Sequence, residues 1–176
     1  MQPRGLVVHT VGVKGDASVA SIRKFHVTKD DPRTAVKEGN GWRDIGYHFV
    51  IRKDGRVELG RPLDQAGAHL EGANDTWGVC IAGDGDSELW TPAQLEAFLD
   101  LAEVLCKQQG WGADRVVGHR EGPAKFGARP TSKRCPGRLV VLPLARLAMV
   151  CEGPPSDKGR VRASSDRSGP PADGRG

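Results

Sequence analysis

Two histidines and one cysteine are the residues of this chain best suited to chemistry. His9 and His119 each lie at the end of a short apolar run, and Cys135 lies in the segment Lys133-Arg134-Cys135-Pro136. Imidazole nitrogens and thiolates are preferred zinc ligands, and three protein ligands leave a fourth position open for water. Because open coordination is typical of catalytic zinc, the three residues predict a zinc hydrolase.

Each of these residues also has an ordinary structural alternative. A single histidine at a strand end is more often a hydrogen-bonded structural residue, and a single cysteine is more often a buried thiol. Cys135, however, is flanked by basic residues and proline, which are not typical of a core. We expect Lys133 and Arg134 to lower the pKa of the Cys135 thiol and so favour the thiolate that a metal requires.

Tyr47, the only tyrosine of the chain, is the next candidate. It begins an expected strand in which alternation places Tyr47 and Phe49 on one face and His48 on the other. The Tyr47 hydroxyl could be satisfied by packing and a local hydrogen bond, or it could point at an oxyanion above a metal. Lys133, two residues before Cys135, could add positive charge at the same point.

Several short strands must position these residues. They are expected at the apolar runs over residues 6–9, 47–52, 56–60, 77–82 and 115–118. Lys53-Asp54-Gly55 separates the second run from the third, and Asp-Gly between apolar runs predicts a hairpin. Residues 30–44 and 120–138 are rich in turn-forming residues and are expected to be loops.

Three helices are expected between and after these strands. The first follows Asp16 as its N-cap. Its apolar residues recur every three positions, at Val19, Ile22 and Phe25. The second begins at Thr91 with a capping box and ends at Gly110, and the third begins near Pro143. Together these elements predict an α/β fold with a central mixed β-sheet flanked by helices.

Length and composition indicate one domain followed by a tail. We assign residues 1–151 to the domain, which is long enough for a substantial core. Residues 152–176 are rich in Gly, Pro, Ser and Arg, so we expect them to be disordered. The net charge of +4 is compatible with anionic partners without selecting one. No motif indicates nucleic-acid binding, and we predict no such partner.

The cysteines and the N-terminus indicate the cellular compartment. Without a Cys-x-x-Cys pair, we interpret the four cysteines as reduced thiols. These are Cys80, Cys106, Cys135 and Cys151. The first residues lack the pattern of a signal peptide, and no apolar run approaches the roughly 20 residues that span a membrane. We therefore expect a protein made in the cytoplasm, without a membrane anchor.

Seven short motifs occur in order over residues 5–138. They are Leu6-Val7-Val8-His9-Thr10, Gly46-Tyr47-His48-Phe49-Val50-Ile51, Lys53-Asp54-Gly55-Arg56-Val57, Gly67-Ala68-His69, Gly78-Val79-Cys80-Ile81-Ala82-Gly83, Gly118-His119-Arg120-Glu121 and Lys133-Arg134-Cys135-Pro136. This series resembles the type 2 N-acetylmuramoyl-L-alanine amidases, a family that includes the peptidoglycan recognition proteins. It looks most like the short lytic amidases, or endolysins, of coliphages.

The resemblance implies roles for individual residues. It implies one zinc ion held by His9, His119 and Cys135, the set reached above from residue types. It makes Tyr47 and Lys133 the catalytic residues.

Three further roles follow from the same resemblance. His69 and Asn74 would line the substrate groove, and Glu121 would orient a zinc ligand unless it is a plain surface carboxylate. Thr10 stands where many relatives carry a second histidine or a cysteine, so the shape of the groove is expected to differ from theirs.

The implied activity is zinc-dependent hydrolysis of the amide bond between N-acetylmuramic acid and L-alanine in peptidoglycan. The endolysin resemblance implies release to the cell wall through a holin-type membrane lesion, and we expect a monomer. A cytoplasmic amidase that recycles muropeptides is one alternative, and a non-catalytic peptidoglycan-binding module is another. Because some phage amidases inhibit a phage RNA polymerase, a polymerase stays open as a regulatory partner.

Overall fold

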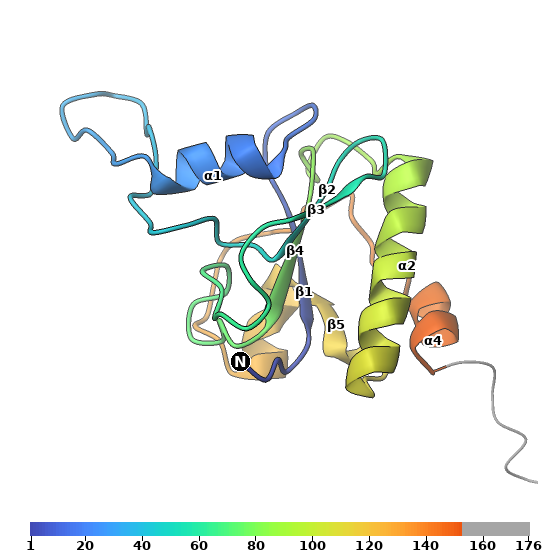
Figure 1. Cartoon of the computed structure of the whole chain (residues 1–176). Coiled ribbons are helices and arrows are strands. Elements are labelled where there is room, and N and C mark those ends of the chain that lie inside the picture. The colour runs from blue at the N-terminus through green and yellow to red at the C-terminus, as the bar shows by residue number, and fades with distance from the viewer. Residues whose placement is uncertain (153–176) are drawn as a thin grey trace, which may run out of the picture.

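The sheet has five strands and is mixed. It lies at the centre of the molecule (Figure 1). The computed structural model describes residues 1–152, and the predicted tail lies outside them apart from Glu152. The strands are β1 (Leu6–Thr10), β2 (Phe49–Ile51), β3 (Val57–Leu59), β4 (Trp77–Ile81) and β5 (Val116–Gly118). Their order across the sheet is β3-β2-β4-β1-β5, and only β3 runs antiparallel to its neighbour. The predicted α/β fold with a mixed sheet is confirmed.

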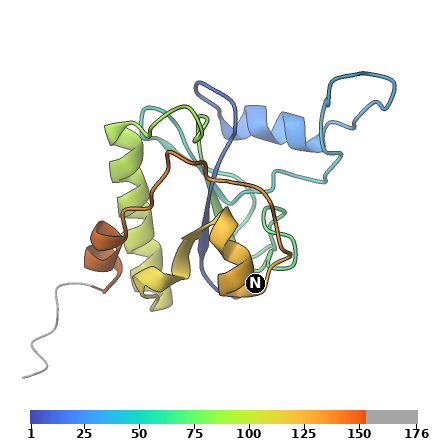
Figure 2. The same ribbon diagram turned by 180° about the vertical axis from the view of Figure 1, so that it is seen from behind.

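Helices cover both faces of this sheet. They are α1 (Val19–Val27), α2 (Pro92–Gln109), α3 (Gly122–Phe126) and α4 (Leu144–Glu152), with 3-10 turns η1 (Ala113–Arg115) and η2 (His119–Glu121). In Figures 1 and 2, α2 and α4 lie together on one side of the sheet and α1 lies on the other. Within the described residues, no helix is long and apolar enough to cross a membrane.

The face under α2 holds the main hydrophobic core. Alternation along β1 directs Leu6 and Val8 to this face, where both are fully buried. They pack with Phe49 of β2 and with Phe98 and Leu99 of α2. Burial of apolar surface on this scale is the main stabilising contribution in a domain of this size.

The opposite face of the sheet is divided into two smaller clusters. Val7 of β1 packs with Phe126 of α3 in one cluster. The other lies under α1 and includes Ile22 and Cys80, with Val11 packed against it. Because Val7, His9 and Val11 alternate along the chain on the same side, His9 lies between the two apolar clusters.

The predicted start and end of α2 are confirmed. Thr91 and Gln94 form the reciprocal capping box, Pro92 is the first helical residue, and Gly110 ends the helix in the left-handed conformation at φ 67°. These local signals succeed because capping and termination depend on neighbouring residues rather than on distant contacts.

The prediction for α1 needs correction. Ser18, not Asp16, caps the helix by accepting a hydrogen bond from the backbone of Ser21. The Asp16 carboxylate instead accepts hydrogen bonds from the side chain of Arg52 and the backbone of Lys53. Phe25 is exposed, and His26 takes the buried position one residue later.

Two further predictions were wrong in detail. Residues 120–138 were expected to be loop, but they contain η2 and α3. β2 begins only at Phe49, so strict alternation does not reach back to Tyr47. Phe49 therefore packs in the core under α2, while Tyr47 packs on the opposite face beside the cluster that contains Cys80.

The reading of all four cysteines as reduced thiols was also wrong. Cys106 near the end of α2 and Cys151 in α4 form a disulfide, and Cys80 and Cys135 are free. The pair is 45 residues apart in sequence. Packing of α4 on α2 brings the two sulfurs together, and no sequence spacing announces such a contact.

Candidate active site

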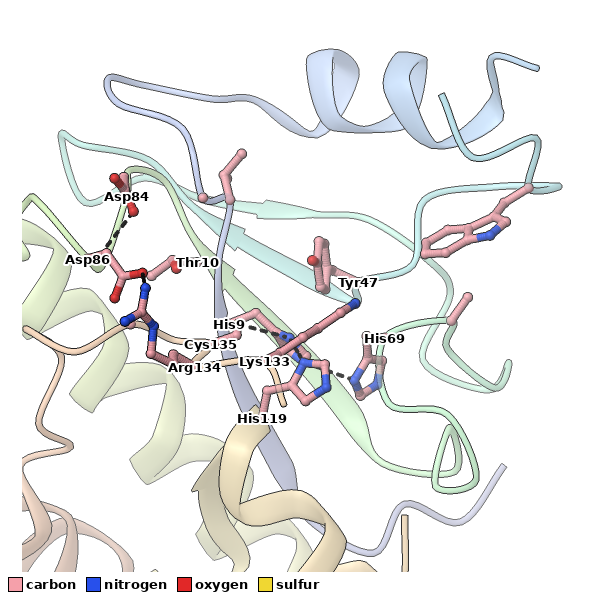
Figure 3. Close-up of a pocket in the computed structure, with 15 residues that line it drawn as sticks. His9, Thr10, Tyr47, His69, Asp84, Asp86, His119, Lys133, Arg134 and Cys135 are labelled. Carbon is pink, nitrogen blue, oxygen red and sulfur yellow. Dashed lines mark hydrogen bonds and ion pairs between the residues drawn. The ribbon is translucent and has the colours of Figure 1, made fainter. Parts of the chain in front are cut away.

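The three predicted zinc ligands meet at the carboxyl ends of neighbouring parallel strands. His9 lies on β1, His119 directly follows β5, and Cys135 lies in the segment between α3 and α4. β1 and β5 are parallel, so both imidazoles project from the same end of the sheet, where α/β proteins usually bind ligands. Figure 3 shows the three side chains pointing toward one another.

The distances suit a single metal ion. The ligand atoms of His9, His119 and Cys135 all lie within 4.8 Å of one another. The Nδ1 atom of His9 is 3.1 Å from Nδ1 of His119 and 3.6 Å from the sulfur of Cys135. Two imidazole nitrogens and a sulfur are a donor set that fits zinc, whose bonds to such atoms measure roughly 2.0–2.3 Å. The residues present therefore fit the ion that the resemblance implies.

Backbone contacts place the cysteine beside the strands. The Thr10 hydroxyl donates to the carbonyl of Pro136 at 2.9 Å, and the Arg120 N–H donates to the carbonyl of Cys135 at 3.0 Å. Gly137 has φ 114°, and a Cβ there would lie 2.2 Å from the backbone of Gly85. This close approach requires glycine and holds the cysteine segment against the loop that follows β4.

Burial keeps the two candidate histidine ligands uncharged. It lowers the pKa of His9 far below its usual value, and nearby His69, His119 and Lys133 lower that pKa further. The pKa of His119 is lowered by burial and then by the positive charge of Lys133. Neutral imidazoles keep a lone pair available for a metal, so both rings are prepared for that role.

Lys133 lowers the pKa of the Cys135 thiol as predicted, but Arg134 is not among its causes and the net direction is upward. Burial raises the pKa of Cys135, and this effect outweighs the lowering by the hydrogen bond from Thr10 and by the charges of Lys133 and Arg120. Arg134 points its guanidinium at Asp86 instead, at 3.3 Å. Without a metal the thiol is therefore protonated at neutral pH, and binding of a metal there would release the proton.

Tyr47 and Lys133 line the same cavity as the three ligands, with a volume of about 450 Å³. The ring of Tyr47 lies 5.0 Å from the ring of His9. Burial raises the pKa of Tyr47 well above its usual value, so its hydroxyl stays protonated and can donate a hydrogen bond. A protonated hydroxyl and an ammonium group beside a metal site are suited to stabilising negative charge on an oxygen.

The loop between β3 and β4 contributes to a second part of this groove. A cavity of about 390 Å³ continues from the first and is lined by His69 and Asn74, among others. The Asn74 side-chain oxygen accepts hydrogen bonds from the backbone N–H groups of His69 and Leu70, each at 2.9 Å. His69 also contacts His9, at 3.2 Å between ring nitrogens. The structure thus brings both residues to the groove, where the resemblance places them.

Glu121 lies apart from the groove. Its carboxylate accepts a hydrogen bond from Arg120 at 2.6 Å, and it lines a small hollow beside β5 with Val116 and Val141. Among the described residues, those that line the two groove cavities do not include Glu121. Its expected role toward a zinc ligand stays a prediction.

Two groove features were missed by the sequence reasoning. Trp42 lines both cavities, and its ring lies 4.6 Å from that of His26. His26 accepts a hydrogen bond from the N–H of Gly46 and so holds the turn that carries Tyr47. The sequence offers no signal for either residue, because the burial of His26 and the place of Trp42 on the groove depend on tertiary contacts.

Comparisons with known proteins agree with this geometry. A family model described as N-acetylmuramoyl-L-alanine amidase, Amidase_2, matches residues 1–138. The endolysin of Klebsiella phage KP32 is 39% identical over 126 residues, which cover 67% of this chain and 76% of the relative. The endolysin of Escherichia phage T7 is 40% identical over 114 residues, which cover 60% of this chain and 68% of the relative.

Solved structures give the same result. The N-acetylmuramoyl-L-alanine amidase LysC from Clostridium intestinale superposes with a TM-score of 0.65 at 26% identity, covering 84% of this chain and 83% of its own. The family match takes in all five strands and all three candidate ligands. The resemblance drawn from the sequence is confirmed, and the chain belongs to the Amidase_2 family of N-acetylmuramoyl-L-alanine amidases.

Proposed function

We propose that this chain is a zinc-dependent endolysin that hydrolyses the amide bond between N-acetylmuramic acid and L-alanine in peptidoglycan. The observation that carries the proposal is the convergence of His9, His119 and Cys135 within 4.8 Å in a groove also lined by Tyr47 and Lys133. Non-catalytic peptidoglycan binding would not require this combination of a metal-ligand set and two oxyanion-stabilising side chains.

The groove residues have separate tasks in this reaction. When bound, zinc would supply a Lewis acid that polarises the amide carbonyl and lowers the pKa of a water molecule. As water adds to the carbonyl carbon, the Tyr47 hydroxyl donates a hydrogen bond to the developing oxyanion, and the Lys133 ammonium adds positive charge there. The C–N bond then breaks, leaving a carboxylate on the lactyl group and a free amine on L-alanine.

The remaining groove residues act on binding. His69 and Asn74 line the second cavity, which is continuous with the first and could hold a further part of the substrate. The mixture of charges in the groove, with Asp84 and Asp86 beside Arg134, suits a substrate that carries both carboxylate and amino groups.

The relatives favour lysis over muropeptide recycling. The matched phage proteins from KP32 and T7 are endolysins. We propose that this chain likewise acts on the cell wall after release, through a holin-type lesion. A regulatory RNA polymerase partner stays a prediction of the resemblance.

Digestion of purified peptidoglycan, with and without a zinc chelator, tests the proposal. We expect mass spectrometry to find free stem peptides that begin with L-alanine, lost on chelation and restored by zinc. A soluble anhydro-muropeptide in a parallel reaction distinguishes the two amidase roles, because a recycling enzyme would prefer it to intact wall. Zinc binding and sedimentation with the wall, without any cleavage, would establish a binding module instead.

A further inference from the structure

The ring of His69 lies between a candidate metal ligand and the backbone, and both of its nitrogens have partners. Its Nδ1 atom is 3.2 Å from Nε2 of His9. Its Nε2 atom is 2.9 Å from the carbonyl oxygen of Thr76. The other nitrogen of His9, Nδ1, is the one that faces His119 and Cys135. The three groups form a continuous chain from backbone to metal site.

The carbonyl oxygen of Thr76 determines which atom donates in each of these hydrogen bonds. A carbonyl oxygen can only accept, so Nε2 of His69 must carry the proton. An imidazole that carries its single proton on Nε2 has a lone pair on Nδ1. That lone pair accepts a hydrogen bond from Nε2–H of His9. The Nδ1 atom of His9, which faces His119 and Cys135, is therefore unprotonated.

We propose that His69 is a positioning residue of the metal centre, which fixes the tautomer and the ring orientation of His9 so that its Nδ1 lone pair faces the ion. The inference rests on the proposed metal centre and adds a role for His69 beyond lining the groove. A metal-bound histidine commonly donates its other N–H to an acceptor that orients it. Here a second imidazole, anchored on Thr76, supplies that acceptor.

The space around His69 is shaped to hold this ring. A Cβ on Gly67 would lie 2.3 Å from Cδ2 of His69, and a Cβ on Gly78 would lie 2.7 Å from Cδ2 and Cγ. Both positions therefore need glycine if the ring is to keep its place. Asn74 holds the backbone N–H of His69, and the hydroxyl of fully buried Thr76 donates to the carbonyl of Ala73. The loop thus fixes the ring from several directions.

His48, a buried histidine next to His69, is a matched control for it. It is fully buried, and its ring lies 5.7 Å from that of His69. Its Nδ1 accepts from the N–H of Gly78, and its Nε2 donates to the carbonyl of Gln65. Both partners of His48 are backbone groups, so its removal affects the fold without touching a candidate ligand.

Nitrogen NMR of the metal-free wild-type protein tests the direction of the hydrogen bonds. Histidine ring nitrogens have distinct chemical shifts when protonated and when bare, so each tautomer can be read directly. We expect a proton on Nε2 and a bare Nδ1 for both His69 and His9. A proton on Nδ1 of His69 would overturn the proposal, and this measurement depends on neither bound zinc nor amidase activity.

Zinc affinity, measured by competition with a chromophoric chelator, tests the consequence. We expect His69→Leu to weaken zinc binding by about 10–100-fold, the usual cost of losing such a partner. His69→Gln, whose amide can accept and donate in the same way, should bind nearly as tightly as wild type, and so should His48→Gln. Wild-type affinity in His69→Leu, or equal weakening in His48→Gln, would overturn the proposal.

Folding of each variant and zinc binding by the wild type must be checked, because failure of either would also change the measured affinities. Circular dichroism of each metal-free variant reports whether it folds. If His69→Leu does not fold, the wild-type tautomers and the His69→Gln affinity still decide the matter, since loss of affinity in folded His69→Gln would count against the proposal. Absence of zinc binding by the wild-type protein would overturn the proposed metal centre instead, while the tautomers would still test the order of the hydrogen bonds.

Discussion

The two faces of the central sheet are built from the same strands but differ in what they contain. On β1, Leu6 and Val8 enter the apolar core under α2, while Val7 and His9 point to the opposite side. The first face holds a continuous cluster of apolar residues. The second has two smaller clusters with the candidate metal ligands between them. Strand alternation therefore lets one five-residue segment serve stability and chemistry at once.

The comparison teaches where each kind of mutation should act. Large apolar residues under α2 contribute mainly to the free energy of unfolding. Polar residues on the groove side reduce the space for apolar packing and are held by specific hydrogen bonds. Substitutions on the two faces should therefore separate stability from metal binding and turnover.

Cys135→Ser should have the largest effect of these variants. It should reduce zinc binding and wall lysis without lowering the stability of the core under α2. Serine is a poor zinc ligand, so we expect loss of tight zinc binding and a fall in wall lysis that exceeds the roughly 100-fold cost of losing an orienting partner. Metal analysis and a turbidity assay on purified walls measure both. Cys80→Ala, which removes the other free cysteine, should keep its zinc. Normal metal content in Cys135→Ser would remove Cys135 from the ligand set.

Phe98→Ala should show the reverse pattern. Phe98 is fully buried in the core under α2. Loss of its ring should lower the free energy of unfolding by about 3–5 kcal/mol, measured by urea denaturation. Zinc affinity of the remaining folded protein should not change. Val104→Ala on the exposed side of the same helix is the control, and its stability should stay close to that of the wild type.

Tyr47→Phe should separate chemistry from metal binding within the groove. Removing one donor to an oxyanion typically costs about 10²–10³-fold in rate. We expect the variant to fold, to bind zinc with unchanged affinity and to lose turnover to this extent. Single-turnover release of stem peptides measures the rate. Wild-type turnover would show that Tyr47 only packs against its neighbours.

Breaking the disulfide between α2 and α4 should lower the free energy of unfolding. The bond joins Cys106 to Cys151, 45 positions apart in sequence, and a cross-link over such a distance contributes roughly 2–4 kcal/mol. Cys151→Ala should therefore lower the urea midpoint while leaving zinc affinity unchanged. Addition of a thiol reductant to the wild type should have the same effect. A reductant that shifts both proteins equally would show that the bond does not contribute.

Acid should destabilise the groove side first. Burial and the nearby charge of Arg61 lower the pKa of His26 to about 4. Between the ordinary value near 6.5 and that value, the unfolded chain binds a proton that the folded chain excludes, so stability falls as the pH drops from 7 to 4. We expect His26→Gln to reduce this loss by about 2 kcal/mol, from urea midpoints at each pH. If stability depends on pH in the variant as it does in the wild type, His26 is not the group responsible.

The parts of the fold that could be predicted depend on local signals. The capping box at Thr91 and the hairpin at Lys53-Asp54-Gly55 were correctly placed because neighbouring residues determine them. Asp16 was misassigned as a helix cap because Ser18 is an equally good cap, and only the contact of Asp16 with Arg52 distinguishes them.

The candidate site shows the same division. His9, His119 and Cys135 could be selected by residue type and by their places at the ends of apolar runs, and the structure brings them together. The contact between His69 and His9 could not be foreseen, because it depends on the path of a loop that leaves β3 and returns to β4. The net rise in the pKa of Cys135 likewise depends on burial, which a list of neighbouring charges does not show.

The position of α4 has a consequence for protein engineering. This helix, the last one within residues 1–152, is tied by its disulfide to α2, and it lies with α2 on the face of the sheet opposite to the one that carries His9. A second domain fused directly after Glu152 would leave the molecule from that side, so it would not cover the groove entrance. A wall-targeting module or an affinity tag at this point should leave access of a polymeric substrate to the groove intact. The disulfide would also anchor the junction, because it holds the final helical turn against the domain.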